Sequence, residues 1–245
     1  MEELFNCRLN GGDVHDLVNF FEREAGKILV DFATPGWMAF TDGFKSSPAS
    51  KIAKRWFDIT ASFILLMFSW PIMLLAAIAI WLEDGFGAPV FFRQNRVGLN
   101  GQHFQVLKFR SMSVDAEGDG KARWATQNDS RVTRVGNFMR RTRIDELPQI
   151  LNVLAGDMAF IGPRPERPEF VSGLAESIPY YNARHCVKPG ITGWAQVCYP
   201  YGSTENDARQ KLQFDLYYVK NHSLFLDFMI CLTTVEVVLF GKGAR

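Results

Sequence analysis

Two adjacent carboxylates, Asp145 and Glu146, lie in the segment RRTRIDELPQILNVL, residues 140–154, and are the residues best suited to chemistry. Pro148 follows them and opens an apolar run. Because proline is favoured in the first turn of a helix, both acids are expected at or just before a helix N-terminus, beside exposed backbone amides. Most Asp-Glu pairs in such a place serve helix capping and surface ion pairing, so the neighbouring residues must decide whether this pair does more.

The segment before the pair, residues 131–143, is strongly basic. It has no acidic residue, and its arginines are Arg131, Arg134, Arg140, Arg141 and Arg143. Guanidinium groups that converge on a helix N-terminus form a site for phosphate oxygens. A carboxylate inside such an anion site suggests either a nucleophile that attacks phosphorus or a ligand for Mg²⁺. We expect the surrounding positive charge to lower the carboxylate pKa and to keep the nucleophile ionised.

Further basic residues lie beside turns in two other segments. Lys108 and Arg110 belong to KFRSM, and Arg164 and Arg167 belong to GDMAFIGPRPERPEF. Each of them alone also fits a solvated surface side chain. Together with the arginines before Asp145, they predict phosphate chemistry.

Composition and missing motifs exclude several other classes of protein. The formal net charge of +1 over 245 residues argues against a protein that coats nucleic acid. The four cysteines have no C-x-x-C spacing and the four histidines have no metal-ligand spacing, which indicates a reduced, cytosolic chain without a structural zinc site. The chain also lacks a P-loop and a G-x-S-x-G elbow, so ATP hydrolysis and serine hydrolase chemistry are not expected. The charged residues 1–16 do not resemble a cleavable signal peptide.

An apolar run, residues 59–82, contains 24 residues without a formal charge. As one straight helix it would be about 36 Å long, enough to cross a bilayer. Pro71 lies in its middle and predicts a kink or a break, and Ser69 could hydrogen-bond the backbone groups that a break exposes. Each half would then span about 18 Å, which reaches the bilayer midplane.

The charges that flank this run decide between three interpretations. Lysines and arginines occur on both sides, at residues 45–55 and 93–110. Cytoplasmic segments carry such an excess, so both ends of the run are expected on the cytoplasmic face. We therefore favour a re-entrant helix–break–helix hairpin, while a kinked transmembrane helix and a buried core helix stay open as alternatives.

The remaining patterns predict an α/β-type fold that is mostly helical with a small β element. Residues 1–50 are interpreted as an N-terminal appendage with one amphipathic helix and a Gly-, Pro- and Ser-rich linker. Asn100-Gly101 predicts a β-hairpin, and residues 131–155 predict helix, turn and helix. Helices are also expected over residues 205–220 and 223–240, and the last packs either in the core or along a membrane surface.

Several motifs in fixed order resemble the bacterial sugar transferase family, the monotopic polyprenyl-phosphate phosphoglycosyl transferases. They are KRWFDI, the interrupted apolar run, PVFFRQNRVGLNGQHFQVLKFRSM, NDSRVTRVGNFMRRTRIDELPQILNVLAGDMAFIGPRPERPEF and KPGITGWAQV. The resemblance covers about residues 51–245, which are expected to form the membrane-inserted catalytic domain. Residues 1–50 resemble the tail of the extra N-terminal region in longer, exopolysaccharide-associated members.

The resemblance implies a reaction and roles for particular residues. Asp145 would attack the β-phosphate of a UDP-sugar, expel UMP and carry a sugar phosphate, which polyprenyl phosphate then removes. Glu146 would help to hold Mg²⁺, and Arg140 and Arg164 would bind phosphate, with Lys108 and Arg110 as further candidates. The implied partners are a UDP-sugar, undecaprenyl phosphate and the lipid bilayer at the cytoplasmic face of the bacterial inner membrane, without nucleic acid. The sugar is unspecified, and a homo-oligomer is left open.

One departure and two competing functions complete the expectations. Typical members break the hairpin at a Ser-Pro pair, whereas this chain has Ser69-Trp70-Pro71, which displaces the serine by one residue. A catalytically idle membrane scaffold that recruits polysaccharide-assembly partners is the main alternative function. A soluble nucleotide-sugar hydrolase is the second, and the charge-free run argues against it.

Overall fold

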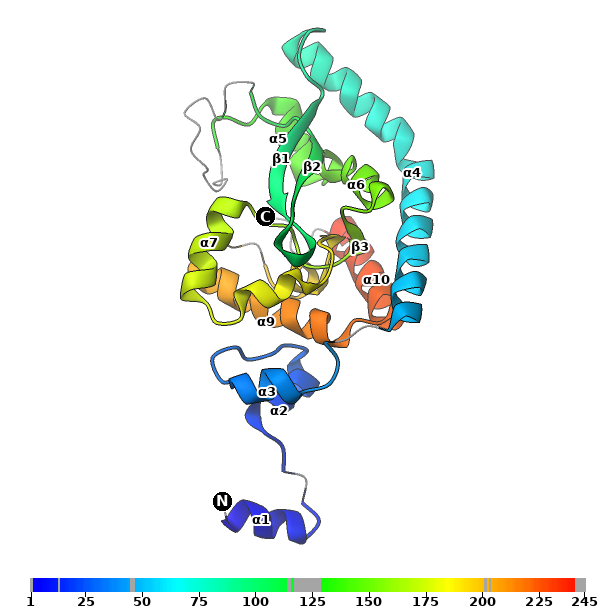
Figure 1. The fold of residues 1–245 in the computed structure, drawn as a ribbon. Helices are drawn as coiled ribbons and strands as arrows, with labels where there is room; N and C mark the ends of the chain where they lie inside the picture. Colours follow the sequence, from blue (N-terminus) through cyan, green and yellow to red (C-terminus); the bar gives the residue numbers. More distant parts are fainter. Residues whose placement is uncertain are drawn as a thin grey trace.

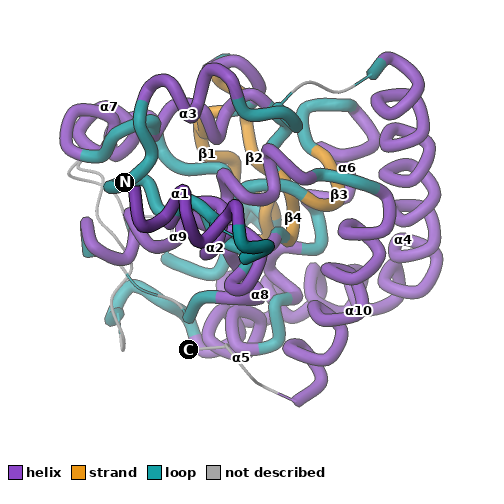
Figure 2. Tube along the Cα trace, turned by 90° about the horizontal axis from the view of Figure 1, so that it is seen from below, coloured by secondary structure: helices purple, strands orange, loops and turns teal. Residues whose placement is uncertain are grey.

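The computed structural model of the chain describes residues 2–12, 14–44, 47–113, 116, 129–200, 202 and 204–240. Most of these residues lie in helices, and the strands form two small sheets (Figures 1 and 2). The elements in chain order are α1 (Glu2–Leu9), α2 (Leu17–Ala25), α3 (Pro35–Phe40), α4 (Pro48–Asp84), β1 (Phe91–Val97), η1 (Leu99–Gly101), β2 (His103–Phe109), α5 (Arg134–Arg141), η2 (Ile144–Glu146), α6 (Gln149–Ala155), β3 (Ala159–Ile161), α7 (Pro168–Ser177), η3 (Tyr181–Cys186), β4 (Gly190–Thr192), α8 (Trp194–Cys198), α9 (Glu205–Asn221) and α10 (Leu224–Phe240).

The predicted hairpin is confirmed. β1 pairs antiparallel with β2 from Phe91 opposite Phe109 to Val97 opposite His103. Asn100 has a φ of 54°, a left-handed conformation that Asn adopts more readily than most residues. The second sheet was not predicted, because β3 and β4 are three residues each and pair in parallel across a long stretch of chain. The turn-rich segment of residues 188–204 contains β4 and α8.

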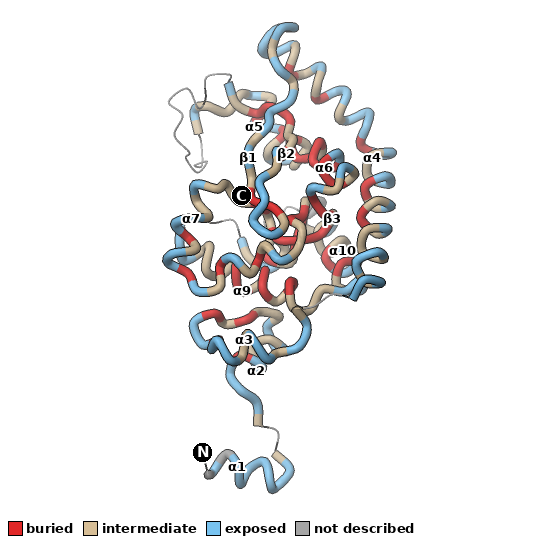
Figure 3. Tube along the Cα trace, viewed as in Figure 1, coloured by how far each residue is buried: buried red, intermediate tan, exposed pale blue. Residues whose placement is uncertain are grey.

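The helices expected at residues 131–155, 205–220 and 223–240 are present as α5, α6, α9 and α10. Buried residues concentrate in β3, α6 and α9, as Figure 3 shows in red. A separate cluster joins the second half of α4 to β2 and α5 through Ala76, Ile80, Phe109 and Met139. Because Ile144 packs against the same cluster, the start of η2 is fixed by α4 as well as by its neighbours in sequence.

Residues 17–44 pack closely on α7, η3 and α9. Ile28 and Val30 are buried in one cluster with Leu212 and Leu216 of α9, and the Ile28 amide donates to the Gln213 carbonyl at 3.0 Å. The segment predicted to be a linker contains the short helix α3. This helix was not predicted from the sequence, because Gly and Pro are uncommon inside helices. Thr34 caps α3 and Pro35 opens it, a combination typical of helix N-termini.

Helix α4 differs from the expected pair of short helices. It begins at Pro48, well before the apolar run, and continues through Pro71 to Asp84 as one curved helix (Figure 1). Proline therefore bends this helix without dividing it. The buried Ser69 hydroxyl donates to Met73 Sδ at 3.9 Å, and not to the backbone acceptor that a break would have exposed. The re-entrant arrangement thus stays a proposal.

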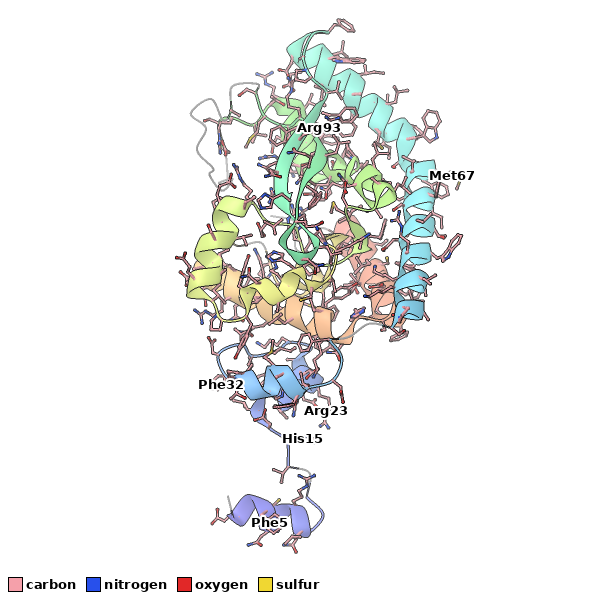
Figure 4. The ribbon with its side chains drawn as sticks, viewed as in Figure 1. Phe5, His15, Arg23, Phe32, Met67 and Arg93 are labelled. Carbon is pink, nitrogen blue, oxygen red and sulfur yellow. The ribbon has the colours of Figure 1, made fainter. Side chains whose placement is uncertain are left out.

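The outer surface of α4 is apolar and exposed. Of its most apolar 18-residue stretch only 17% is buried, which contradicts the interpretation as a buried core helix. Met67 points away from the body of the protein in Figure 4, and Phe68 and Leu75 are 69% and 66% exposed. Within the described part of the chain, α4 is the one helix long and apolar enough to cross a membrane. Helix α10 lies beside it and also exposes apolar side chains, among them Phe225 and Phe228, while Ile230 is buried.

Both ends of α4 are attached to the same body. Near its start, the Arg55 guanidinium donates to the carbonyls of Val153 and Leu154 in the last turn of α6, at 2.6 and 2.8 Å. At its end, Glu83 accepts from the amides of Arg134 and Val135, the first residues of α5, at 2.8 and 3.1 Å. Both ends of α4 are therefore fixed to the part of the protein that contains α5 and α6.

A close approach between α5 and the segment just after β2 depends on Gly136. A Cβ atom at this position would lie 2.1 Å from the Ser111 carbonyl oxygen, far inside van der Waals contact. We expect Gly136→Ala to lower the free energy of unfolding by about 1–3 kcal/mol, because backbone must move to accept it. Gly173→Ala, in the middle of α7 with no heavy atom within 4 Å of the new Cβ, should instead raise it by up to about 1 kcal/mol. Chemical unfolding in detergent micelles measures both, and equal effects would contradict this explanation.

Candidate active site

A tight backbone turn presents the two carboxylates. Arg143, at the end of the basic segment, has a φ of 59°, a left-handed conformation that costs a non-glycine residue about 1 kcal/mol or more. η2 follows at once and holds Asp145 and Glu146, and Pro148 then caps α6. The sequence prediction that the pair lies just before a helix N-terminus is confirmed. Both carboxylates are nevertheless buried, at 7% and 8% exposure, so they are not surface ion-pairing residues.

Helix α6 is fastened to the β-hairpin by one side chain. Asn152 accepts from the Leu107 amide at 2.9 Å and donates to the Gln105 carbonyl at 2.8 Å, and so completes hydrogen bonds at the edge of β2. Because Lys108 is the next residue of β2, this contact sets the distance between Lys108 and the turn before α6. The local structure therefore brings a cation and two anions together through backbone geometry.

Glu146 is surrounded by cations. Lys108 Nζ lies 2.9 Å from its Oε1, and Arg164 Nη2 lies 2.6 Å from the same oxygen. Arg164 Nη1 lies 3.4 Å from Oε2 and also donates to Gln196 Oε1 at 3.1 Å, while Arg143 Nη1 lies 3.7 Å from Oε2. Lys108 and Arg164, which are 56 residues apart in the sequence, thus contact the same carboxylate. Gln196 was missed because a single glutamine carries no recognisable signal.

The environment of Asp145 is different. Its Oδ1 is buried and has no hydrogen-bond partner among the residues that the structure describes. Burial raises its pKa to about 6, the negative charge of Glu146 adds to the rise, and Lys108, Arg140 and Arg164 oppose it. The expectation of a lowered pKa at Asp145 is therefore wrong, because burial and the adjacent carboxylate outweigh the arginines. At pH 7, a group with this pKa is still about nine-tenths ionised.

Glu146 shows the lowered pKa instead. Burial would raise it, but Arg164 and Lys108 together outweigh burial and hold the pKa of Glu146 well below its usual range. Burial lowers the pKa of Lys108, with Glu146 opposing that shift. Two neighbouring carboxylates therefore have opposite properties: Glu146 is paired with cations and has a lowered pKa, whereas Asp145 has a raised pKa and a buried oxygen without a partner among the described residues.

The other predicted basic residues are placed less centrally. Arg140 donates from Nε to Ser111 Oγ at 3.0 Å, and its charge acts on Asp145. Arg110 is buried and its Nη2 bonds Asp84 Oδ2 of α4 at 2.7 Å, so it does not contact either carboxylate. Its Nε and Nη1 are buried without a partner among the described residues. Of the remaining arginines in the basic segment, Arg131 pairs with Asp129.

The site suits a divalent cation only in partnership with a substrate. Among the described residues, no cluster of three or more His, Cys, Asp or Glu side chains could enclose a metal ion. Mg²⁺ commonly takes one or two carboxylates and completes its shell with water and phosphate oxygens. The unpartnered oxygen of Asp145 beside Glu146 fits that mode. Two carboxylates amid Lys108, Arg140, Arg143 and Arg164 leave an excess of positive charge, which favours an anionic ligand such as a diphosphate.

Comparison with known proteins agrees with this chemistry. A family model described as bacterial sugar transferase matches residues 49–241. The chain is 43% identical over 242 residues to the UDP-N-acetylgalactosamine-undecaprenyl-phosphate N-acetylgalactosaminephosphotransferase of Aeromonas hydrophila, covering 99% of this chain and 56% of that protein. It is also 45% identical to a UDP-glucose:undecaprenyl-phosphate glucose-1-phosphate transferase of Xanthomonas campestris pv. campestris, over 79% of this chain and 40% of that protein. A protein of the latter name from Caulobacter vibrioides is 44% identical, over 80% of this chain and 73% of its own length. The chain thus spans about half the length of the first two relatives.

The two carboxylates should respond oppositely to neutralisation in a metal-free buffer with EDTA at pH 8. We expect Asp145→Asn to raise the free energy of unfolding by about 1–3 kcal/mol, because it removes an unpartnered buried charge. Glu146→Gln should lower it by about 1–3 kcal/mol, because Lys108 and Arg164 lose their counter-charge.

The pH dependence of the Asp145→Asn effect is an internal control. The folded-state pKa of Asp145, about 6, lies above its ordinary value of 3.8, so the penalty in wild type is full above pH 6 and disappears as the pH falls toward 4. The stabilisation by Asp145→Asn should disappear over the same range. Stabilisation by both substitutions, or by neither, would contradict the described electrostatics.

Proposed function

The chain belongs to the bacterial sugar transferase family, and we propose that it transfers a sugar-1-phosphate from a UDP-sugar to undecaprenyl phosphate. The products are UMP and undecaprenyl-diphosphate-sugar, the first lipid-linked intermediate of an exopolysaccharide or glycoconjugate. The observation that carries this proposal is a buried carboxylate with an unpartnered oxygen, Asp145, inside a cluster of cations. The names of the relatives support the class of donor and acceptor.

The reaction proceeds in two displacements at phosphorus. An oxygen of the Asp145 carboxylate forms a bond to the β-phosphorus of the UDP-sugar, and the bond from that phosphorus to the bridging oxygen breaks, so UMP leaves with the electron pair. A phosphate oxygen of the acceptor lipid then bonds to the same phosphorus, and the bond to Asp145 breaks. The free carboxylate is regenerated, so no further reactant is consumed.

The cationic side chains stabilise charge on the transferring phosphoryl group. Lys108, Arg140 and Arg164 all act electrostatically on Asp145, and they come from β2, α5 and the loop after β3. Cations held in place before the reaction stabilise a developing negative charge without reorganising. Arg110 is directed toward α4, so its contribution to phosphate binding is the weakest of the predicted set.

Glu146 is the proposed Mg²⁺ ligand, with Asp145 beside it. Its low pKa keeps the carboxylate ionised throughout the neutral range, and a bound metal ion would replace one of the cations that now contact its oxygens. The bound ion would neutralise phosphate charge as a Lewis acid. The protein contributes the rigid turn at Arg143, which holds both carboxylates at fixed positions before any ligand arrives.

We assign catalysis to residues 51–245 and the membrane contact to the exposed side of α4, on the cytoplasmic face of the inner membrane. Both ends of α4 bind the same polar body, through Arg55 and Glu83. A helix fastened at both ends to one body cannot place them on opposite sides of a bilayer. The apolar run would therefore enter and leave on the same side, as in a re-entrant segment, with the curve at Pro71 deepest.

A catalytically idle scaffold is the less favoured function. A scaffold does not need two buried carboxylates with divergent pKa values, whereas group transfer does. The sugar is not chosen by these observations, because the relatives use both glucose and N-acetylgalactosamine donors.

Labelling of the protein tests the nucleophile. Wild type incubated with Mg²⁺ and UDP-glucose or UDP-N-acetylgalactosamine, each ³²P-labelled at the β-phosphate, should retain label when acceptor lipid is absent. Asp145→Asn should retain none, and its UMP release should fall by about 10³-fold or more, as for loss of a covalent nucleophile.

Asp42→Asn is the matched control, because Asp42 is exposed and lies outside the cluster. It should label like wild type, and EDTA should abolish labelling until Mg²⁺ is restored. Equal labelling of Asp145→Asn and wild type would contradict the assignment of Asp145 as the nucleophile. Absence of UMP release by wild type with every UDP-sugar would favour the scaffold.

Accessibility to a membrane-impermeant maleimide tests the topology. Glu24→Cys and Gly87→Cys place single exposed thiols on either side of α4 in a background lacking Cys7, Cys186, Cys198 and Cys231. We expect neither thiol to react from the periplasm in intact cells, and both to react after permeabilisation. Periplasmic labelling of just one of them would make α4 a true crossing.

A further inference from the structure

The loop that carries Arg164 is held by its backbone in an unusual way. Pro163 and Pro165 flank the arginine, so neither neighbour has an amide N–H and both have a fixed φ. Each of four consecutive carbonyls accepts a hydrogen bond from outside the loop, two of them from adjacent residues at the end of β1. They are Pro163 from the Gly190 amide at 2.9 Å, Arg164 from Arg184 Nη2 at 2.9 Å, Pro165 from Arg96 Nη1 at 3.0 Å and Glu166 from the Val97 amide at 3.0 Å.

Of the two arginines that donate from their side chains, Arg184 is buried more deeply than Arg96. It is 5% exposed, and besides the Arg164 carbonyl it contacts Asp215 and Tyr181. Its Nη2 lies 2.8 Å from Asp215 Oδ2, and its Nη1 donates to the Tyr181 hydroxyl at 2.8 Å. Asp215 belongs to α9 and is itself 2% exposed. The contact therefore connects the main core of the protein to the backbone of Arg164.

The buried pair of Arg184 and Asp215 is not well explained by a contribution to stability alone. Removing two charges from water costs several kcal/mol per ion, and well-packed apolar residues often stabilise a core as well or better. Its position is more informative, because Arg184 donates to the carbonyl of the residue whose side chain binds Glu146. When the backbone of Arg164 is held in place, its guanidinium group reaches Glu146 from a fixed starting point. This favours the contact of both Arg164 nitrogens with the Glu146 carboxylate.

We propose that Arg184, held by Asp215 and Tyr181, is a positioning residue that acts on Glu146 through Arg164. This inference rests on the proposed transferase function. Arg184 does not contact either carboxylate in the described structure, so its effect must pass through the Arg164 carbonyl. A displacement of about 1 Å at a catalytic group can cost about 100-fold in rate.

A double-mutant cycle separates positioning from general stabilisation. The variants are Arg184→Gln, Arg164→Ala and their combination, assayed for UMP release with Mg²⁺, undecaprenyl phosphate and either UDP-glucose or UDP-N-acetylgalactosamine. We expect Arg184→Gln alone to reduce kcat/KM by about 100-fold. In the Arg164→Ala background, it should reduce kcat/KM further by less than about threefold, because the group it positions is gone. Equal factors in both backgrounds would overturn the proposal, as would an unchanged kcat/KM in the single variant.

A second buried ion pair provides the matched control. Lys54 Nζ lies 3.1 Å from Asp227 Oδ2, and Asp227 is 1% exposed, but these residues connect α4 to α10 and do not touch the Arg164 loop. Asp227→Asn should destabilise the protein while kcat/KM falls by less than about threefold at a temperature where the protein stays folded. If Arg184→Gln does not fold, Tyr181→Phe retains the Arg184 charge and removes only its hydroxyl acceptor. It should reduce kcat/KM in wild type and not in Arg164→Ala, and additivity there would equally overturn the proposal.

Chemical modification gives a readout that does not require turnover. Arg164 is 31% exposed, and its guanidinium is engaged by Glu146 and Gln196. Phenylglyoxal followed by mass spectrometry should modify Arg164 several-fold faster in Arg184→Gln or Tyr181→Phe than in wild type or Asp227→Asn. Unchanged reactivity would contradict the positioning role even if the wild type released no UMP, whereas absence of UMP release alone would contradict the proposed function.

Discussion

The ionised carboxylate of Glu146 imposes the main constraint on this structure, because a buried charge is costly unless other groups compensate it. Its compensation comes from Lys108 at the end of β2, Arg164 in the loop after β3 and Arg143 immediately before the turn. Three segments far apart along the chain must therefore meet at one point. Much of the surrounding architecture serves this meeting: Asn152 fastens α6 to β2, and four outside donors hold the carbonyls of the Arg164 loop.

Asp145 lies in the same turn, and its pKa is shifted in the opposite direction to that of Glu146. The cations are engaged mainly by its neighbour, so burial and the charge of Glu146 dominate and raise its pKa to about 6. Pairs of titratable groups whose environments push their pKa values apart are typical of sites with divided roles. Here the carboxylate of Glu146 is paired with protein cations, and Asp145 has a buried oxygen without a partner among the described residues.

Helix α4 couples this polar site to an apolar surface. Its inner side contributes Ala76 and Ile80 to the cluster that supports α5 and the turn, while residues such as Phe68 and Leu75 face outward. Its last residue, Asp84, pairs with Arg110, and Glu83 caps α5, the helix that ends in the arginines before Asp145. In the proposed reaction a lipid acceptor and a water-soluble donor meet at one carboxylate, and a helix with these two sides brings the apolar surface within one packing layer of that carboxylate.

The sequence by itself determined most of the longer elements and the basic character of the segments around the carboxylate pair. The Asn100-Gly101 hairpin and the helices on either side of the pair follow from local patterns, because turns, helix starts and charge runs are short-range signals. That Lys108 and Arg164 meet on one carboxylate was decided by the tertiary structure. Tertiary structure decided which carboxylate carries the lowered pKa, that Arg110 turns to Asp84, and that α3 forms within a Gly- and Pro-rich stretch. It also decided that α4 continues through Pro71. These outcomes depend on burial and on partners distant in the chain, and a pKa or a hydrogen-bond partner is set by what surrounds a group in space, which no local pattern contains.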